Sequence, residues 1–148
     1  AMLNYQGFNK LSLQAKNIVN NIDKIKAAFK EDSDIIIYGN PSVCVVGFGS
    51  NTMNIYELSQ KMKHLGWNLN ELQNPASFHL CLTNCHTTDI IDNFIKDMKT
   101  SLDVIIGNNS NPGKKVESGS SIYGTTQKVP DQKIVDNVVV KYLNSIHL

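Results

Sequence analysis

The sequence has little of several features that would assign a function class directly. Its 148 residues contain only 3 cysteines, an odd number that argues against a disulfide scaffold and indicates a reducing compartment. The formal net charge is +1, so no excess of charge indicates a nucleic acid or a membrane surface as the partner. No apolar run approaches the roughly 20 residues that span a bilayer, and the first residues do not predict a signal peptide.

The residues that are present predict one globular domain covering 1–148, because hydrophobic residues make up 41% and charged residues 18% of the chain. Apolar residues at steps of three and four predict four helices. These run from Asn4 to Phe29, from Asn54 to Gly66, from Thr88 to Gly107 and from about Asp131 onward. The second helix has a capping-box spacing between Asn54 and Glu57.

Two of these helices have apolar stripes that we expect to face the core. The first stripe contains Phe8, Leu11, Ala15, Ile18, Val19, Ile22, Ile25 and Phe29. The stripe of the last helix contains Ile134, Val135, Val138, Tyr142, Leu143 and Ile146.

Short strands separate the helices. The runs Ile35–Tyr38 and Val43–Phe48 flank turn residues and predict a hairpin. A second strand pair is expected within Trp67–Leu82, on either side of the turn signal Asn74-Pro75. The order of elements predicts an α+β fold, with a small, mostly antiparallel four-stranded sheet and packing helices.

The segment Asn108–Pro130 has no periodicity and is rich in Asn, Ser, Gly and Lys. Loops of this length in a compact domain are usually functional or disordered. Tyr123 lies in its only apolar island, Ser120–Gly124. We expect Tyr123 either to pack the loop onto the domain or to reach a functional site in another domain.

Three weaker patterns suggest chemistry, and each has a structural interpretation that we favour. Gly47–Thr52 lies between a strand and a helix like a dinucleotide fingerprint, but Thr52 replaces the third glycine. His79, Cys81, Cys85 and His86 are side chains that bind zinc, although Phe78, Leu80 and Leu82 already explain this stretch as a core strand.

The third pattern is a cysteine–histidine nucleophile pair, formed by Cys44 or Cys81 with His79 or His86. Cys44 lies among valines, where a thiol is normally inert. We therefore predict no metal site and no catalytic residue in this chain.

Five short sequence motifs, taken in order, carry a resemblance to a known family. These are Ile37–Pro41, Val45–Ser50, Gly66–Gln73, Phe78–Thr83 and Ile122–Gly124, followed by the last helix. Together they resemble the C-terminal small domain of sphingosine-1-phosphate lyases, over nearly the whole chain from about Tyr5 to Leu148. The most specific parts are Gly-Trp-Asn-Leu-Asn, at 66–70, and Ile-Tyr-Gly, at 122–124.

The resemblance implies a parent enzyme of the pyridoxal-phosphate-dependent fold type I, in its decarboxylase-like group. Such an enzyme cleaves a sphingoid base phosphate to a fatty aldehyde and phosphoethanolamine. The Schiff-base lysine follows a histidine in the large domain of that family, and no His-Lys pair occurs in this sequence. The resemblance therefore implies that the large domain binds the cofactor, and that this chain binds none and is inactive alone.

Few residues can be transferred from the family. Tyr123 and Gly124 match its loop near the active site, and Trp67, Asn68 and Asn70 match a strand whose role we interpret as mainly structural. Glu117, Ser118 and Ser120 depart from the family pattern ahead of Ile122.

The expected partners are the large domain of the same protein, a second subunit of a homodimeric parent and the sphingoid base phosphate, with no nucleic acid. The resemblance places the domain on the cytoplasmic side, with a possible endoplasmic reticulum anchor outside this chain. The alternative hypothesis is a free-standing binding or regulatory module that uses the loop Asn108–Pro130.

Overall fold

The computed structural model describes residues 5, 7–109 and 132–146. Its elements are α2 (Phe8–Phe29), β1 (Ile36–Ile37), β2 (Val45–Gly49), α3 (Ile55–His64), β3 (Asn70–Leu72), β4 (Ser77–Cys81), α4 (Thr88–Asn109) and α6 (Gln132–Ile146). This order confirms the predicted α+β class. Tyr123, Gly124 and most of the loop predicted at Asn108–Pro130 lie outside the described residues.

The four strands form one antiparallel sheet in the order β1-β2-β4-β3. The central pair is β2 and β4, in which Phe48 lies opposite Phe78 and Val46 lies opposite Leu80. The turn between β3 and β4 contains a cis peptide bond at Asn74-Pro75, and Asn74 adopts a φ of 51°. Both predicted strand pairs are therefore present, and α3 connects them.

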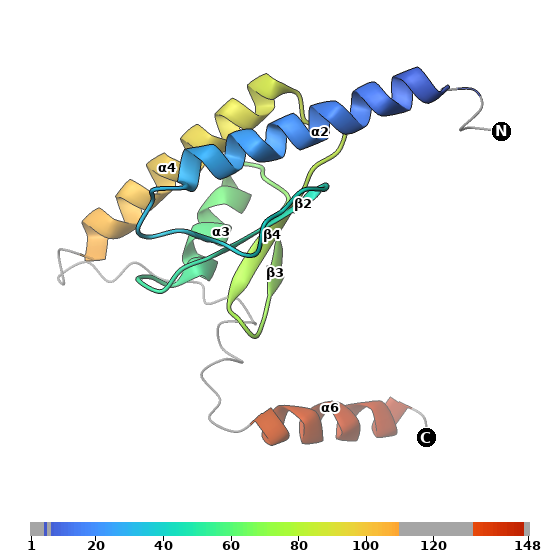
Figure 1. Cartoon of the computed structure of the whole chain (residues 1–148). Coiled ribbons are helices and arrows are strands. Elements are labelled where there is room, and N and C mark those ends of the chain that lie inside the picture. Colours follow the sequence, from blue (N-terminus) through green and yellow to red (C-terminus); the bar gives the residue numbers. More distant parts are fainter. Residues whose placement is uncertain (1–4, 6, 110–131, 147–148) are drawn as a thin grey trace.

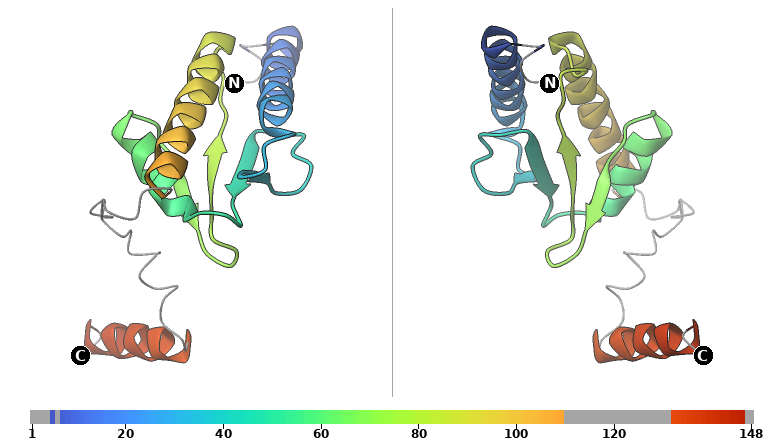
Figure 2. Two further views of the ribbon diagram at one scale, coloured as in Figure 1. Left: turned by 90° about the vertical axis from the view of Figure 1, so that its left-hand side faces the viewer. Right: turned by 90° about the vertical axis from the view of Figure 1, so that its right-hand side faces the viewer.

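Helices α2, α3 and α4 lie on one face of the sheet, and no other element of the described part of the chain covers the opposite face (Figures 1 and 2). The alternation along the central strands follows from this arrangement. Val46, Phe48, Phe78 and Leu80 are buried against the helices. We call the uncovered side the open face; it carries Val45, Gly47, Gly49, Asn70, Leu72, His79 and Cys81, with Tyr38 lying across the two glycines.

The core between sheet and helices is centred on the ring of Phe48. The centroid of this ring lies 5.3 Å from that of Phe78, 5.9 Å from that of Phe94 and 6.1 Å from that of Phe29. These rings come from β2, β4, α4 and α2. One aromatic cluster thus joins both central strands to two helices, at distances where aromatic pairs are favourable.

The predicted apolar stripe of α2 enters this core only in its second half, which corrects the expectation for the first half. Ile22, Ile25 and Phe29 are buried, whereas Phe8 is 84% exposed. Figure 1 shows the reason: the first turns of α2 extend beyond the sheet and the other helices. The periodicity of the sequence identified the stripe but not how much of it this domain covers.

The expectation that the stripe of the last helix faces inward is also wrong for the side chains that are described. In α6, Val138, Tyr142 and Leu143 are exposed, and Tyr142 is 65% exposed. Figures 1 and 2 show α6 apart from the sheet and its helices. The amphipathic pattern was sufficient to predict the helix, but it does not say which surface covers the apolar side. None of the helices in the described ranges is long and apolar enough to cross a membrane.

Candidate functional site

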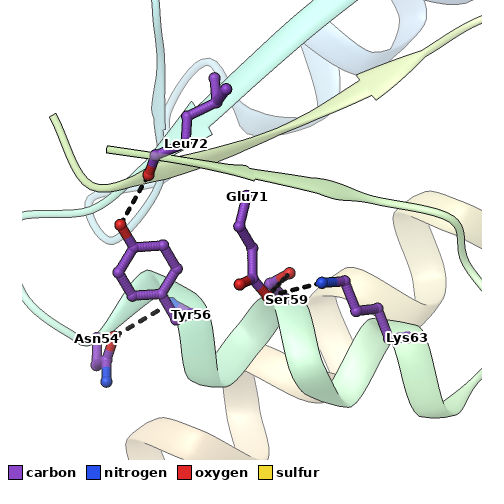
Figure 3. Close-up of polar contacts among 6 residues, drawn as sticks. All are labelled: Asn54, Tyr56, Ser59, Lys63, Glu71 and Leu72. Carbon is purple, nitrogen blue, oxygen red and sulfur yellow. Dashed lines mark hydrogen bonds and ion pairs between the residues drawn. The ribbon is translucent and has the colours of Figure 1, made fainter. Parts of the chain in front are cut away.

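The signature segment Trp67–Leu72 is held to helix α3 by a polar cluster (Figure 3). Glu71 Oε1 accepts a hydrogen bond from Ser59 Oγ at 3.0 Å and forms an ion pair with Lys63 Nζ at 2.8 Å. The hydroxyl of Tyr56 donates to the backbone oxygen of Leu72 at 2.7 Å. Only 3% of the Glu71 side chain is exposed, so its charge is buried at a cost in free energy. The Ser59 hydroxyl and the Lys63 ammonium offset this cost.

The electrostatics of this cluster favour a structural role. Burial, and then the charge of Glu71, raise the pKa of Tyr56 above its usual value. Tyr56 therefore stays protonated and keeps its hydrogen bond at neutral pH. Asn54 caps the same helix by accepting a hydrogen bond from the backbone nitrogen of Tyr56 at 3.2 Å. Asn54 is thus the N-cap of α3, as predicted, but its side chain bonds Tyr56 and not Glu57.

Trp67 links the signature segment to α4 as well. Its indole nitrogen donates to Asp97 Oδ2 at 2.9 Å, and its ring lies edge-on to Phe94 at 5.1 Å. Gly66, which precedes it, has a φ of 95° and ends α3 as predicted. The contacts of this segment join β3, α3 and α4, which supports the structural interpretation of Trp67.

The open face carries an imidazole, an amide and a phenol close to one another along the strands. His79 Nε2 and Asn70 Nδ2 lie 3.4 Å apart on the paired strands β4 and β3. Tyr38 covers Gly49 so closely that a Cβ added there would lie 2.5 Å from the phenol oxygen. An imidazole, an amide and a phenol can hydrogen-bond a docked surface. They do not form the nucleophile, base and orienting group of a catalytic triad.

The four candidate zinc ligands have separate roles in the structure. His79 lies beside Asn70, and His86 Nδ1 accepts a hydrogen bond from the backbone nitrogen of Thr83 at 2.9 Å. Cys81 lies opposite Val45 at the end of β4, and the nearby Cys44 thiol helps to raise the pKa of Cys81. Within residues 7–109 and the other described positions, no three metal-binding side chains are grouped so that they hold an ion.

A cysteine nucleophile is also disfavoured at this position. Partial desolvation by its neighbours, and then the Cys44 thiol, raise the pKa of Cys81, although the residue as a whole is exposed. A reactive cysteine requires the opposite shift, which an electropositive environment produces. The side chains on this face therefore do not support cysteine-based catalysis.

The dinucleotide interpretation is contradicted by the sheet. Strand β2 pairs only with antiparallel neighbours, whereas a dinucleotide fingerprint needs parallel strands joined through a helix. Thr52 Oγ1 donates to Asp34 Oδ1 at 2.7 Å and thus fastens the connection to α3. The favoured interpretation of Gly47–Thr52, a strand end that leads into a helix, is therefore confirmed.

Sequence reasoning missed one polar contact between α2 and the connection from β4 to α4. Asn21 is buried, and its Nδ2 donates to the backbone oxygen of His86 at 2.7 Å. A pocket of about 200 Å³ lies beside this contact, lined by Asn17, Asn21, Thr83, Asn84 and four neighbours. The signal in the sequence is an asparagine directly before the apolar position Ile22, inside an amphipathic helix.

No model of a known protein family matches the chain. Among curated proteins, it is 33% identical over 142 residues to the sphingosine-1-phosphate lyase of Drosophila melanogaster, covering 95% of this chain and 26% of that protein. It is 39% identical over 141 residues to a probable sphingosine-1-phosphate lyase of Legionella pneumophila, covering 88% of this chain and 23% of that protein. The chain thus spans about a quarter of the length of these relatives.

Solved structures agree with these relatives. The structure of a Burkholderia pseudomallei sphingosine-1-phosphate lyase superimposes with a TM-score of 0.64 and 25% identity, over 68% of this chain and 23% of that one. A complex of the cystine C-S lyase C-DES with cysteine persulfide superimposes with a TM-score of 0.54 at 11% identity, which shows a shared fold alone. These findings confirm the resemblance predicted from the sequence.

Proposed function

We propose that this chain is the small domain of a sphingosine-1-phosphate lyase. It is homologous to a segment that makes up about a quarter of the length of such lyases. The observation that carries the proposal is the match to the Drosophila enzyme over 95% of this chain and only 26% of that enzyme. The parent reaction that we infer is the cleavage of a sphingoid base phosphate to a fatty aldehyde and phosphoethanolamine. In this reaction pyridoxal phosphate, when bound, supplies an electron sink for the broken carbon–carbon bond.

Two lysine-lined hollows in the described part of the chain do not fit pyridoxal phosphate. A site for it needs a lysine, a cradle for the phosphate and a carboxylate for the pyridine nitrogen. The hollow beside Lys61 is lined by His64, Leu65, Thr100, Ser101 and Val104 and has no carboxylate. The hollow beside Lys30 and Lys99 contains Glu31 and Asp32, which repel a phosphate. These features support a cofactor site in the remainder of the lyase.

Within the parent lyase, we assign this chain a positioning role. Tyr123 and Gly124 are the residues that we expect to approach the active site, on the strength of the family resemblance alone. The core centred on Phe48 and the contacts of Glu71 stabilise the sheet and the helices around it. The homodimeric state and the endoplasmic reticulum anchor of the parent remain predictions.

The exposed half of the α2 stripe supports a contact with the large domain. Phe8 and Leu11 continue, at the same helical spacing, the stripe that Ile22 and Ile25 bury in the core. A single helix face thus passes from a covered region to an uncovered one. We infer that the remainder of the lyase packs on the uncovered half, so that α2 contributes to two adjoining hydrophobic cores.

The proposal is tested with the purified chain and pyridoxal phosphate. We expect no absorbance band of a lysine aldimine and no release of fatty aldehyde from sphingosine-1-phosphate. The Legionella relative, prepared in parallel, is the positive control for both measurements. A stable aldimine on a lysine of this chain, together with turnover, would overturn the proposal.

A further inference from the structure

Cys44 and Cys81 are neighbouring residues at one end of the two central strands. Cys81 is the last residue of β4 and lies opposite Val45, the first residue of β2. The backbone nitrogen of Leu82 donates to the backbone oxygen of Cys44 at 2.6 Å, which holds the two chain segments together. The Cys44 thiol also acts on the Cys81 thiol electrostatically, since it is one of the groups that raise the pKa of Cys81.

The backbone separation of the two residues is compatible with a disulfide. Opposite residues of antiparallel strands have Cα atoms about 4.5–5.5 Å apart, and one further residue adds a rise of about 3.4 Å. The Cα atoms of Cys44 and Cys81 are therefore roughly 6 Å apart, inside the range of disulfides. Cys44 is opposite Leu82 in the continued register, but it lies in a bend just before β2, where strand alternation no longer fixes the direction of its side chain.

Both thiols are also accessible to a reagent. Cys81 is exposed and Cys44 is half-buried. Both are free, as is Cys85. Cys85 lies in the connection to α4, where its backbone nitrogen donates to Thr83 Oγ1. The chain therefore contains one adjacent pair and one separate cysteine that serves as an internal control.

We propose that Cys44 and Cys81 are a modification site that forms a reversible intramolecular disulfide by exchange with a small-molecule disulfide such as oxidised glutathione. The thiolate of one cysteine attacks the glutathione disulfide, forms a mixed disulfide and releases one glutathione thiolate. The thiolate of the other cysteine then attacks the protein sulfur of the mixed disulfide and releases the second glutathione. Two protein thiols are thereby oxidised, one glutathione disulfide is reduced, and the two glutathione thiolates take up the protons.

The modification would link the start of β2 to the end of β4. It would add a covalent bond at the end of the β2–β4 pair. There, a backbone hydrogen bond from Leu82 to Cys44 joins the two segments just outside the strands. Excess reduced glutathione reverses the exchange by the same two steps. The site is independent of the lyase assignment, because it requires only these two cysteines and an oxidant.

The test uses the reduced chain, incubated under native conditions with oxidised glutathione and then unfolded for counting of its free thiols. We expect Cys44 and Cys81 to disappear from the count without glutathione adducts, whereas Cys85 stays free or carries one glutathione, and the chain still migrates as a monomer without reductant. Peptide mass spectrometry should identify the Cys44–Cys81 link. Cys85→Ser should fall from two free thiols to none, and added reduced glutathione should restore both.

Cys44→Ser and Cys81→Ser provide matched controls, since each replaces one sulfur by oxygen at nearly the same volume. We expect neither variant to form an intramolecular disulfide, and circular dichroism verifies that each remains folded. The proposal is overturned if Cys85→Ser keeps both thiols or carries only glutathione adducts. It is also overturned if the links found involve Cys85 or join two chains.

Discussion

The indole nitrogen of Trp67 lies 2.9 Å from Oδ2 of Asp97, and this hydrogen bond joins the start of the signature segment to helix α4. The two residues are 30 positions apart in the sequence. Since the ring of Trp67 also lies against Phe94, its packing and its hydrogen bond anchor the same connection. Their contributions can be separated by substitution.

Trp67→Phe should keep most of the packing and lose the hydrogen bond. We expect the free energy of unfolding to fall by about 1–3 kcal/mol, the usual cost of removing a bond to a charged acceptor. The measurement is a urea titration followed by circular dichroism, because the only tryptophan of the chain is removed. In an Asp97→Ala background the same substitution should cost clearly less, and an equal cost in both backgrounds would contradict the assigned bond.

The raised pKa of Tyr56 predicts a loss of stability in alkaline solution. Burial, and then Glu71, raise this pKa above 10.0 in the folded chain, so the folded state binds the proton more tightly than the unfolded state. The contribution is fully present below the unfolded value of 10.0 and is lost as the pH rises through the folded pKa. Urea titrations between neutral pH and pH values above 10.0 measure it.

Tyr56→Phe is the variant that isolates this effect. It should cost about 1 kcal/mol at neutral pH, because the hydrogen bond to the backbone oxygen of Leu72 is lost. It should also make the alkaline decline of stability shallower. A decline as steep as that of the unmodified chain would show that another group causes it.

Because Tyr38 lies so close to Gly49, the effect of Gly49→Ala on stability should depend on whether Tyr38 is present. In the unmodified chain, Gly49→Ala should destabilise by about 1 kcal/mol, because the new methyl group displaces the Tyr38 ring. In a Tyr38→Ala background, the same change should be neutral or stabilising, since alanine restricts the unfolded chain more than glycine does. Thermal melts of the four proteins measure the coupling, and additive effects would contradict the contact.

Local patterns were sufficient to predict most elements of the fold. The stripe Ile22, Ile25 and Phe29, the cap at Asn54 and the glycine at the end of α3 all act within a few residues. Each of these signals has a physical cause that neighbouring residues decide, such as side-chain direction or a positive φ. The predicted and observed elements therefore agree in type and in order.

The pairing of β2 with β4 and the contacts between distant residues could not be obtained in this way. Strand β4 lies between β2 and β3, and this placement brings Cys81 next to Cys44 and Trp67 next to Asp97. Such contacts depend on how helices and strands pack, which periodicity does not encode. The same limit explains why the stripes containing Phe8 and Tyr142 were expected in the core and lie exposed.

The two halves of the α2 stripe provide the last prediction. Ile25→Ala should lower the free energy of unfolding by about 2–5 kcal/mol, because it opens a cavity in the core. Phe8→Ser, on the same stripe, should change it by less than about 0.5 kcal/mol, since Phe8 is 84% exposed in this chain. Urea titrations of both variants at several protein concentrations make the comparison.

A large cost of Phe8→Ser that is independent of concentration would mean that this half is covered within the chain itself. A cost that grows with concentration would mean that a second copy covers it, and either outcome would remove the support that this surface gives to a contact with the large domain.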